Sequence, residues 1–217
     1  MLARDFVNYF LSKKKTKKYL EIGLYHGMTF NYVDADIKHS VDPDENLLPT
    51  FKMTSDSFFR NVAPVINVKY DVIFIDGLHH MEQVDKDIEN SFKFLEDDGI
   101  IVLHDCNPIN EMRQRVPADF DIWVHGWNGD VWKSIAKFRK NNSHLKTDVF
   151  VINIDEGIGV IKNNVEGVEL ILELPDKLDY EFLDKHRTEI LNLKSVEEFH
   201  KYEIDSFIKD YLKYWKL

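Results

Sequence analysis

Two mainly apolar runs mark the centre of the chain. Residues 70–75 are apolar except for one aspartate and lead into Asp76, and residues 100–103 are wholly apolar and lead into His104-Asp105. Runs of this length, bounded by turn residues, predict strands that are buried on both faces. Between them the apolar positions recur with helical spacing over residues 81–95. A strand, a helix and a strand in this order predict a right-handed parallel crossover, in which both strands end at the same edge of the sheet.

Shorter apolar segments extend this pattern toward both ends of the chain. They predict further strands at residues 18–22, 39–43, 50–53, 149–154 and 158–161. The other predicted helices precede the first strand, cover 28–33, begin at Ser55 and cover 130–140. The last two strands are separated only by Asp-Glu-Gly, which favours an antiparallel hairpin. The sequence therefore predicts an α/β fold of Rossmann-like type, with helices flanking a mostly parallel sheet that ends in a hairpin.

The chain after residue 165 has a different character. Residues 168–174 predict one more strand, and Ser195 with Glu198 forms a capping box that opens a helix. We expect residues 1–165 to form the domain and residues 166–217 to form a mainly helical extension. We expect this extension to pack on the domain or to lie in the interface of a homo-oligomer, because its aromatic residues are more typical of an interface than of a cofactor site.

Composition narrows the classes of partner. The 217 residues carry a formal net charge of -10, and such a surface repels phosphate backbones, which argues against a nucleic-acid partner. No apolar stretch is long enough to span a bilayer and the N-terminus lacks an apolar leader, so we expect no membrane partner and a cytoplasmic location. The single cysteine, Cys106, excludes an internal disulfide and a cysteine-rich zinc site.

The first strand runs into a turn punctuated by two glycines, with the pattern Glu21-Ile-Gly23-x-x-x-Gly27-x-Thr29. Such a turn before a helix lets backbone N–H groups approach a nucleotide-like ligand. The pattern lacks the Gly-x-Gly-x-x-Gly spacing of a pyrophosphate cradle. It therefore favours a nucleoside without a diphosphate over NAD.

Two further groups of side chains follow the second and third strands. Asp42 lies where a carboxylate would meet ribose hydroxyls, although Asp-Pro is also a common turn dipeptide. Ser55 and Asp56 would lie against an adenine edge, although helix capping explains them equally well. The residues leave both alternatives open.

The ends of the two central strands carry the chemically active side chains Asp76, His79, His80, His104 and Asp105. Open sheets bind ligands at this edge. One interpretation is a divalent metal ion held by Asp76, His104 and Asp105, in which the histidine favours manganese, iron or zinc over magnesium. In a second interpretation no metal is present and His79 or His80 acts as a general base. In a third, these side chains only cap helices and bond loop backbone.

Several motifs, taken in their order along the chain, resemble those of class I S-adenosylmethionine-dependent methyltransferases. The resemblance is carried by the glycine turn, Asp42, Phe-Ile-Asp76-Gly-x-His79, Ile-Val-x-His104-Asp105-x-x-Pro108 and Gly129-Asp130-Val-Trp132. It is strongest to the small-molecule branch called methyltransferase family 24, relatives of macrocin-type sugar O-methyltransferases. It covers residues 18 to 162 and leaves the extension outside.

The resemblance implies a seven-stranded sheet whose last strand is antiparallel. The residues it assigns to S-adenosylmethionine are Glu21, Gly23, Gly27, Thr29, Asp42, Ser55, Asp56 and Asp76. Among them the glycines would line the methionine and ribose, Asp42 the ribose hydroxyls, and Ser55 with Asp56 the adenine. It also favours Asp76 and Asp105 as metal ligands over His104.

The activity that the resemblance implies is methyl transfer to a small polar metabolite, at a hydroxyl of a sugar or natural product. Such a protein must align the acceptor and remove its proton. A non-catalytic nucleoside-binding or scaffold protein on the same fold is the first alternative, and a nicotinamide-dependent oxidoreductase, which the glycine spacing disfavours, is the second. Acceptor specificity is expected from residues 109–129, which include Trp123, His125 and Trp127, and from the extension. No pattern there identifies the acceptor.

Overall fold

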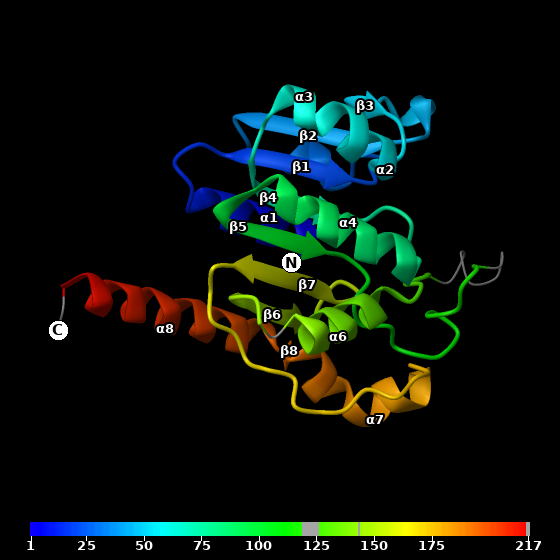
Figure 1. Ribbon diagram of the computed structural model, residues 1–217, viewed down its shortest axis with the longest axis vertical. Helices are drawn as coiled ribbons and strands as arrows, with labels where there is room; N and C mark the ends of the chain where they lie inside the picture. Colours follow the sequence, from blue (N-terminus) through cyan, green and yellow to red (C-terminus); the bar gives the residue numbers. More distant parts are fainter. Residues whose placement is uncertain (119–125, 143, 216–217) are drawn as a thin grey trace.

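The fold is built on one eight-stranded sheet. The computed structural model describes residues 1–118, 126–142 and 144–215, with side chains up to residue 206. The strands are β1 (Lys18–Ile22), β2 (Ile37–Asp42), β3 (Phe51–Lys52), β4 (Tyr70–Ile75), β5 (Leu95–Leu103), β6 (Thr147–Ile152), β7 (Ile158–Asn163) and β8 (Leu193–Lys194). Their order across the sheet is β3-β2-β1-β4-β5-β7-β6-β8 (Figure 1). β7 is antiparallel to both of its neighbours, and the other pairs are parallel.

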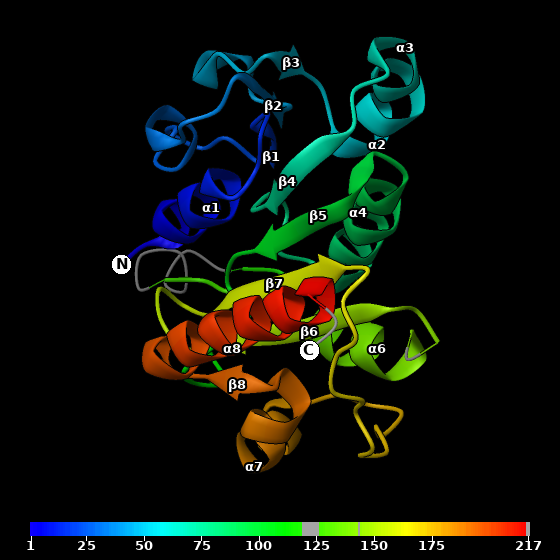
Figure 2. The same ribbon diagram turned by 90° about the vertical axis from the view of Figure 1, so that its left-hand side faces the viewer.

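Helices cover both faces of the sheet. They are α1 (Ala3–Ser12), α2 (Ser55–Ser57), α3 (Ala63–Ile66), α4 (Met81–Lys93), α6 (Val131–Asn141), α7 (Tyr180–Leu191) and α8 (Val196–Trp215), with the short turns η1 (Phe30–Tyr32), η2 (Glu45–Leu47) and η3 (Phe58–Val62). Figure 2 shows α1 and α8 on one face and α2, α3, α4 and α6 on the other. The described helices include none that is both long enough and apolar enough to cross a membrane.

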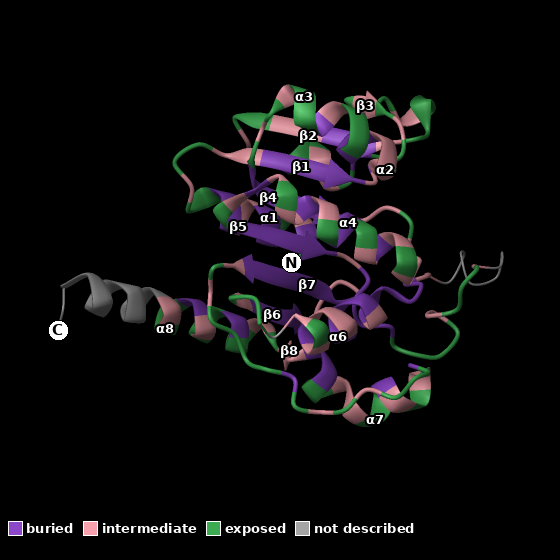
Figure 3. Cartoon of the chain, in the orientation of Figure 1, coloured by how far each residue is buried: buried purple, intermediate pink, exposed green. Residues whose placement is uncertain are grey.

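Burial on two faces explains why the central strands are mainly apolar. In β4, Ile73 and Ile75 belong to the core beneath α4 and α6, whereas Val72 and Phe74 belong to the core beneath α1. All six residues of β4 are therefore buried (Figure 3). The predicted central strands, the crossover through α4 and the antiparallel hairpin of β6 and β7 are confirmed.

The extension adds the eighth strand, which the sequence did not predict. β8 pairs with the outer edge of β6, with Leu193 opposite Val151. Because β7 and β8 occupy both edges of β6, residues 168–174 have no free edge there, and the strand predicted for them does not form. Leu170 is nevertheless buried, so this segment contributes a side chain to the interior without contributing a strand.

The helix predicted over residues 28–33 is also wrong. Only the 3-10 turn η1 forms there, and Val33 is already extended. The chain has to rejoin the sheet by Ile37, whose N–H donates to the carbonyl of Lys17 at 3.1 Å. The ammonium of Lys38 bonds the Phe30 carbonyl at 2.9 Å and so closes this short turn.

The helix α8 is anchored to the sheet by its first half. Phe199 packs edge-on against Phe6 and Phe10 of α1, with ring centroids 5.5 and 6.0 Å apart. One helical turn later, the buried carboxylate of Glu203 pairs with the ammonium groups of Lys162 and Lys13. Residues of the extension therefore pack on the sheet, while the division at residue 165 and its role in an oligomer stay predictions.

The carboxyl ends of β1 and β4 approach each other closely at Gly23. This glycine has a φ of +89°, and an added Cβ would lie far inside van der Waals contact with the carbonyl of Asp76. The Asp76 N–H donates to the Ile22 carbonyl at 2.8 Å, so the two strand ends are bonded where they meet. Only glycine fits this position.

Replacing Gly23 tests this close approach. We expect Gly23→Ala to lower the free energy of unfolding by about 2 kcal/mol or more, because alanine is strained at this φ and its methyl group collides with backbone. Urea unfolding followed by tryptophan fluorescence measures the loss. The matched control is Gly77→Ala, whose added Cβ would lie 3.6 Å from Ile22, an ordinary contact. Equal stability of the two variants would contradict the account.

Candidate active site

A cavity of about 720 Å³ lies at the carboxyl ends of the parallel strands. Its walls come from the segments that follow β1, β2, β4 and β5, from the start of α2 and from one face of α4. The lining residues that the sequence singled out are Gly23, Asp42, Ser55, Asp56, Asp76, His79, His104, Asp105 and Trp127. This is the edge at which open α/β sheets bind ligands, and its volume is in the range of small-molecule sites.

The glycine turn forms one wall of this cavity and is held by backbone bonds. The Gly23 N–H donates to the Val41 carbonyl at 2.9 Å, and the carboxylate of Asp42 accepts the Leu24 N–H at 2.8 Å. A second oxygen of Asp42 accepts the Asp44 N–H at 2.8 Å. Asp42 therefore shapes the turn, and its remaining lone pairs can still accept from hydroxyls in the cavity.

The structure decides whether Ser55 and Asp56 cap helix α2 or line the cavity. The residue that caps α2 is Thr54, whose hydroxyl accepts the Ser57 N–H at 3.3 Å. Ser55 and Asp56 lie within the first turn of α2, line the cavity and bond the amide of Gln83 on α4. Helix capping is thus not their role.

At the other end of the cavity, two histidines and two aspartates meet. Nε2 of His79 lies 3.3 Å from Oδ1 of Asp76 and 3.5 Å from Oδ2 of Asp105. Nδ1 of His104 lies 2.9 Å from that same oxygen of Asp105. Polar side chains from the ends of β4 and β5 therefore converge as the sequence predicted.

His79 is fixed from the side opposite the carboxylates. Its Nδ1 lies 3.2 Å from the carbonyl of Trp127, and its ring stacks on the indole with centroids 5.2 Å apart. Nδ1 can donate to that carbonyl, while Nε2 faces Asp76 and Asp105 on the other side of the ring. Burial disfavours the charged imidazole, but the bond to Asp76 and the charge of Asp105 outweigh it and raise the pKa of His79.

His104 differs from His79 because both of its ring nitrogens face carboxylates. Nδ1 faces Asp105, and Nε2 lies 3.5 Å from Asp155 in the turn between β6 and β7. Burial opposes the charged form, but Asp76, Asp105 and Asp155 outweigh it and raise the pKa of His104 well above its usual value. The surrounding carboxylates therefore favour the protonated, cationic form of His104.

The donor atoms that could hold one metal ion belong to Asp76, His79 and Asp105. One ligand atom from each lies within 4.8 Å of the others. The set expected from the sequence contained His104 in place of His79. A site of two carboxylates and one imidazole suits manganese, iron or zinc better than magnesium, and the Trp127 carbonyl orients the imidazole as metal-binding histidines are oriented.

Four predicted residues do not line the cavity: Glu21, Gly27, Thr29 and His80. Glu21 is buried and bonded by the Tyr19 hydroxyl at 2.5 Å, and burial raises its pKa to about 8. Gly27 and Thr29 belong to the turn before η1, where Gly27 has a φ of +67°. His80 precedes α4 and packs edge-on against Trp127. Trp123 and His125 lie outside the described residues.

Sequence reasoning missed three residues that complete the site. Asp155 was interpreted only as part of a hairpin turn. Asn128 is buried and donates its amide to Oδ1 of Asp105 at 2.9 Å, but it lies within residues 109–129, which show no periodicity. Asp87 is one of the buried positions of α4 and was missed because its helix was considered only for its apolar face.

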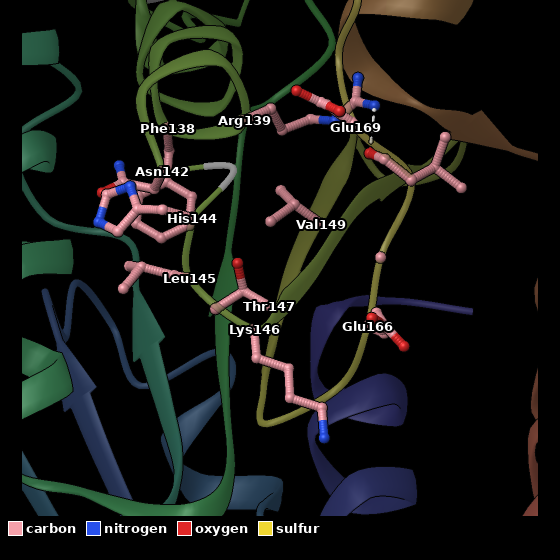
Figure 4. Close-up of a pocket in the computed structure, with 12 residues that line it drawn as sticks. Phe138, Arg139, Asn142, His144, Leu145, Lys146, Thr147, Val149, Glu166 and Glu169 are labelled. Carbon is pink, nitrogen blue, oxygen red and sulfur yellow. Dashed lines mark hydrogen bonds between the residues drawn. The ribbon is translucent and has the colours of Figure 1, made fainter.

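A second, smaller cavity of about 290 Å³ lies between α6 and residues 166–169 (Figure 4). Arg139 bonds the carbonyls of Glu189 and Ile190 at the end of α7, and the carbonyl of Val168. It therefore joins the extension to the domain. None of the candidate catalytic or cofactor residues lines this cavity.

Residues 20–106 match a family model described as a methyltransferase domain. No curated protein matches the sequence. The fold is similar to that of a protein from Corynebacterium glutamicum, with a TM-score of 0.53 and 13% identity over 75% of this chain and 81% of that chain. It is also similar to an O-methyltransferase from Bacillus cereus in complex with SAH, with a TM-score of 0.51 and 13% identity over 74% and 80% of the two chains.

At such identities the two structures show the fold alone. The family match spans the glycine turn and both strand ends that line the cavity. A model of a methyltransferase domain therefore matches the part of the chain that builds most of the cavity, and the fold is similar to that of a solved O-methyltransferase.

Proposed function

We propose that the protein transfers the methyl group of S-adenosylmethionine to a hydroxyl of a small polar metabolite, in the class of sugars and natural products. The observation that carries the proposal is that one cavity joins the Gly23 turn to the carboxylates and imidazoles at the ends of β4 and β5. The solved structure from Bacillus cereus, an O-methyltransferase in complex with SAH, supports the same combination of cofactor and chemistry.

The residues along the cavity fit the cofactor. Gly23 lines the cavity, and because it carries no side chain the amino-acid part of the cofactor can approach its backbone. Asp42 has lone pairs left for the ribose hydroxyls, and Ser55 with Asp56 lies beyond it for the adenine. The sulfonium of the cofactor supplies a methyl group on a leaving group that is already good. The protein therefore has only to align the acceptor and take its proton.

The strand-end cluster is placed to take that proton. Asp76, Nε2 of His79 and Asp105 would hold a divalent ion, which lowers the pKa of a bound hydroxyl. Asp105 is itself held by Asn128 and His104, and His79 by Trp127. In the metal-free alternative, Nε2 of His79 receives the proton directly. Both routes use the same side chains and differ in whether a metal ion is bound.

Calorimetry with S-adenosylhomocysteine tests the cofactor and the role of Asp105 together. We expect micromolar binding to the wild type and no comparable binding of NADH. Asp105→Asn keeps the side chain's shape and tolerates the φ of +60° at this position. This variant should bind S-adenosylhomocysteine within a few-fold of wild type.

Turnover by the same variant completes the test. Release of S-adenosylhomocysteine is measured over a panel of sugars, glycosides and catechols, and Asp105→Asn should lose at least about 100-fold. The control is Asp97→Asn, an exposed aspartate near the other end of β5, which should retain wild-type rates. Binding of NADH without S-adenosylhomocysteine would refute the cofactor, and an active Asp105→Asn would refute the mechanism.

Binding of Mn²⁺ separates the two routes. The electron paramagnetic resonance signal of free Mn²⁺ should fall on addition of wild-type protein, and Asp76→Asn should weaken this binding about tenfold or more, since it removes a ligand charge. Asp97→Asn is the control, because it makes the same change of charge at an exposed position near the other end of β5, outside the three-ligand cluster. Equal Mn²⁺ binding by wild type and Asp76→Asn would exclude this metal site and favour His79 as the base.

A further inference from the structure

The connection that follows β5 is bonded from outside by helix α7 of the extension. Nη1 of Arg187 donates to Oδ1 of Asn107 at 2.6 Å and to the carbonyl of Pro108 at 2.9 Å. Tyr180, in the first turn of the same helix, donates its hydroxyl to the carbonyl of Ile109 at 2.8 Å. Two side chains of α7 therefore hold three successive residues of the connection.

Arg187 is itself held in one orientation. Its Nη2 donates to the Tyr180 hydroxyl at 3.0 Å and to Oδ1 of Asp184 at 3.2 Å, so both ends of the guanidinium fork have partners. The side chain of Arg187 is only 18% exposed. Because the guanidinium is planar, its N–H groups point in fixed directions, which a flexible lysine ammonium would not reproduce.

Asn107 is the residue through which this contact reaches the candidate active site. It is buried, its N–H donates to the carbonyl of Glu156, and its side-chain amide donates to Oδ1 of Asn153, both at 2.9 Å. Asp105, two residues earlier, has a φ of +60°, a sparsely populated conformation that persists where the surrounding structure fixes it. With Arg187 on its side-chain oxygen, Asn107 anchors the chain after Asp105 on both the β6–β7 turn and α7.

The far end of the same connection returns to the site. The carbonyl of Arg113 accepts the N–H of Asn128 at 3.0 Å, and the carbonyl of Arg115 accepts the indole N–H of Trp127 at 2.7 Å. Asn128 and the Trp127 carbonyl are in turn the groups that contact one carboxylate and one imidazole of the strand-end cluster. Residues 107–116 therefore support the cluster from two sides.

We propose that Arg187 is a positioning residue for methyl transfer, which acts through residues 107–109 to fix Asp105, and with it the acceptor, relative to the cofactor's methyl group. The inference rests on the proposed function. A misplacement of about 1 Å in a reacting geometry can cost about 100-fold in rate. The match to the methyltransferase model ends at residue 106, so this support comes from a part of the chain outside the matched segment.

Replacement of Arg187 by alanine separates positioning from cofactor binding. On an acceptor that the wild type methylates, Arg187→Ala should lower kcat at least about tenfold, because the cluster loses its alignment. Affinity for S-adenosylhomocysteine, measured by calorimetry, should stay within about threefold of wild type, since the interaction removed acts in the transition state. The Gly23 turn and Asp42, assigned to the cofactor, are bonded through β1 and β2 instead.

Chemical rescue distinguishes positioning from a general loss of stability. Millimolar guanidinium should raise the kcat of Arg187→Ala at least about threefold, because the free ion can donate to Asn107 and Pro108 in the space that the side chain leaves. A variant that was only unstable would respond in the opposite way, since guanidinium is a denaturant. The control is Lys185→Ala, which removes a positive charge from an exposed position of α7 and should keep wild-type kcat with no rescue.

Tyr180→Phe provides a smaller change for the case in which Arg187→Ala does not fold. It removes one hydroxyl, and so the bond to the Ile109 carbonyl and one partner of Arg187, and should lower kcat about twofold or more.

Three results would overturn the inference alone: wild-type kcat in Arg187→Ala, a loss that guanidinium does not reverse, or, where that variant does not fold, wild-type kcat in Tyr180→Phe. If the wild type methylates no acceptor of the panel, the proposed function itself is refuted and the inference with it.

Discussion

The contact between the ends of β1 and β4 is the constraint on which the site depends. At Gly23 the backbone of the first strand lies against the backbone of Asp76, with no space for a side chain. The register continues this contact into the sheet, with Ile22 opposite Ile75. Because the strands meet here, the turn assigned to the cofactor and the residues assigned to the chemistry are neighbours in space, although about fifty positions separate them in sequence.

Electrostatic balance is the second organising feature of the site. Asp76, Asp105 and Asp155 would repel one another in a partly buried edge without nearby positive charge. His104 lies between Asp105 and Asp155, and these carboxylates favour its positively charged form, since its pKa is raised. His79 faces Asp76 and Asp105 with one nitrogen while its other nitrogen faces a backbone carbonyl. The two histidines therefore have different tasks, although the sequence presents both simply as residues that follow a strand.

The sequence predicted the parts of the fold that depend on local pattern. β4 and β5 were evident because both of their faces are buried, and the β6–β7 hairpin because only three residues were predicted to separate its strands. β8 was missed because two residues carry no periodicity, and its presence in turn removes the edge that residues 168–174 would need. The turn η1 replaces a predicted helix because the chain must return to the sheet within a few residues.

The residues of the candidate site also divide into those that local sequence pattern predicts and those that only the tertiary structure reveals. Side chains directly after strands, such as Asp76 and Asp105, were found by position. Asp155, Asn128 and Asp87 arrive from a hairpin turn, an irregular connection and a helix face, so only the tertiary arrangement shows that they belong to the site. The choice of His79 over His104 as the third possible metal ligand likewise depends on which ring nitrogen faces which oxygen, and no sequence pattern encodes that.

With the cofactor bound in the cavity, its methyl group is expected to lie beside the strand-end cluster of Asp76, His79 and Asp105. A crystal structure of the complex with S-adenosylhomocysteine tests it most directly. We expect the homocysteine against Gly23, the ribose hydroxyls at Asp42, and the sulfur turned toward Asp76, His79 and Asp105. That placement would let an acceptor oxygen held by the cluster lie about 3–3.5 Å from the transferred methyl carbon. A ligand bound outside this cavity, or one with its sulfur turned away from the cluster, would contradict the account.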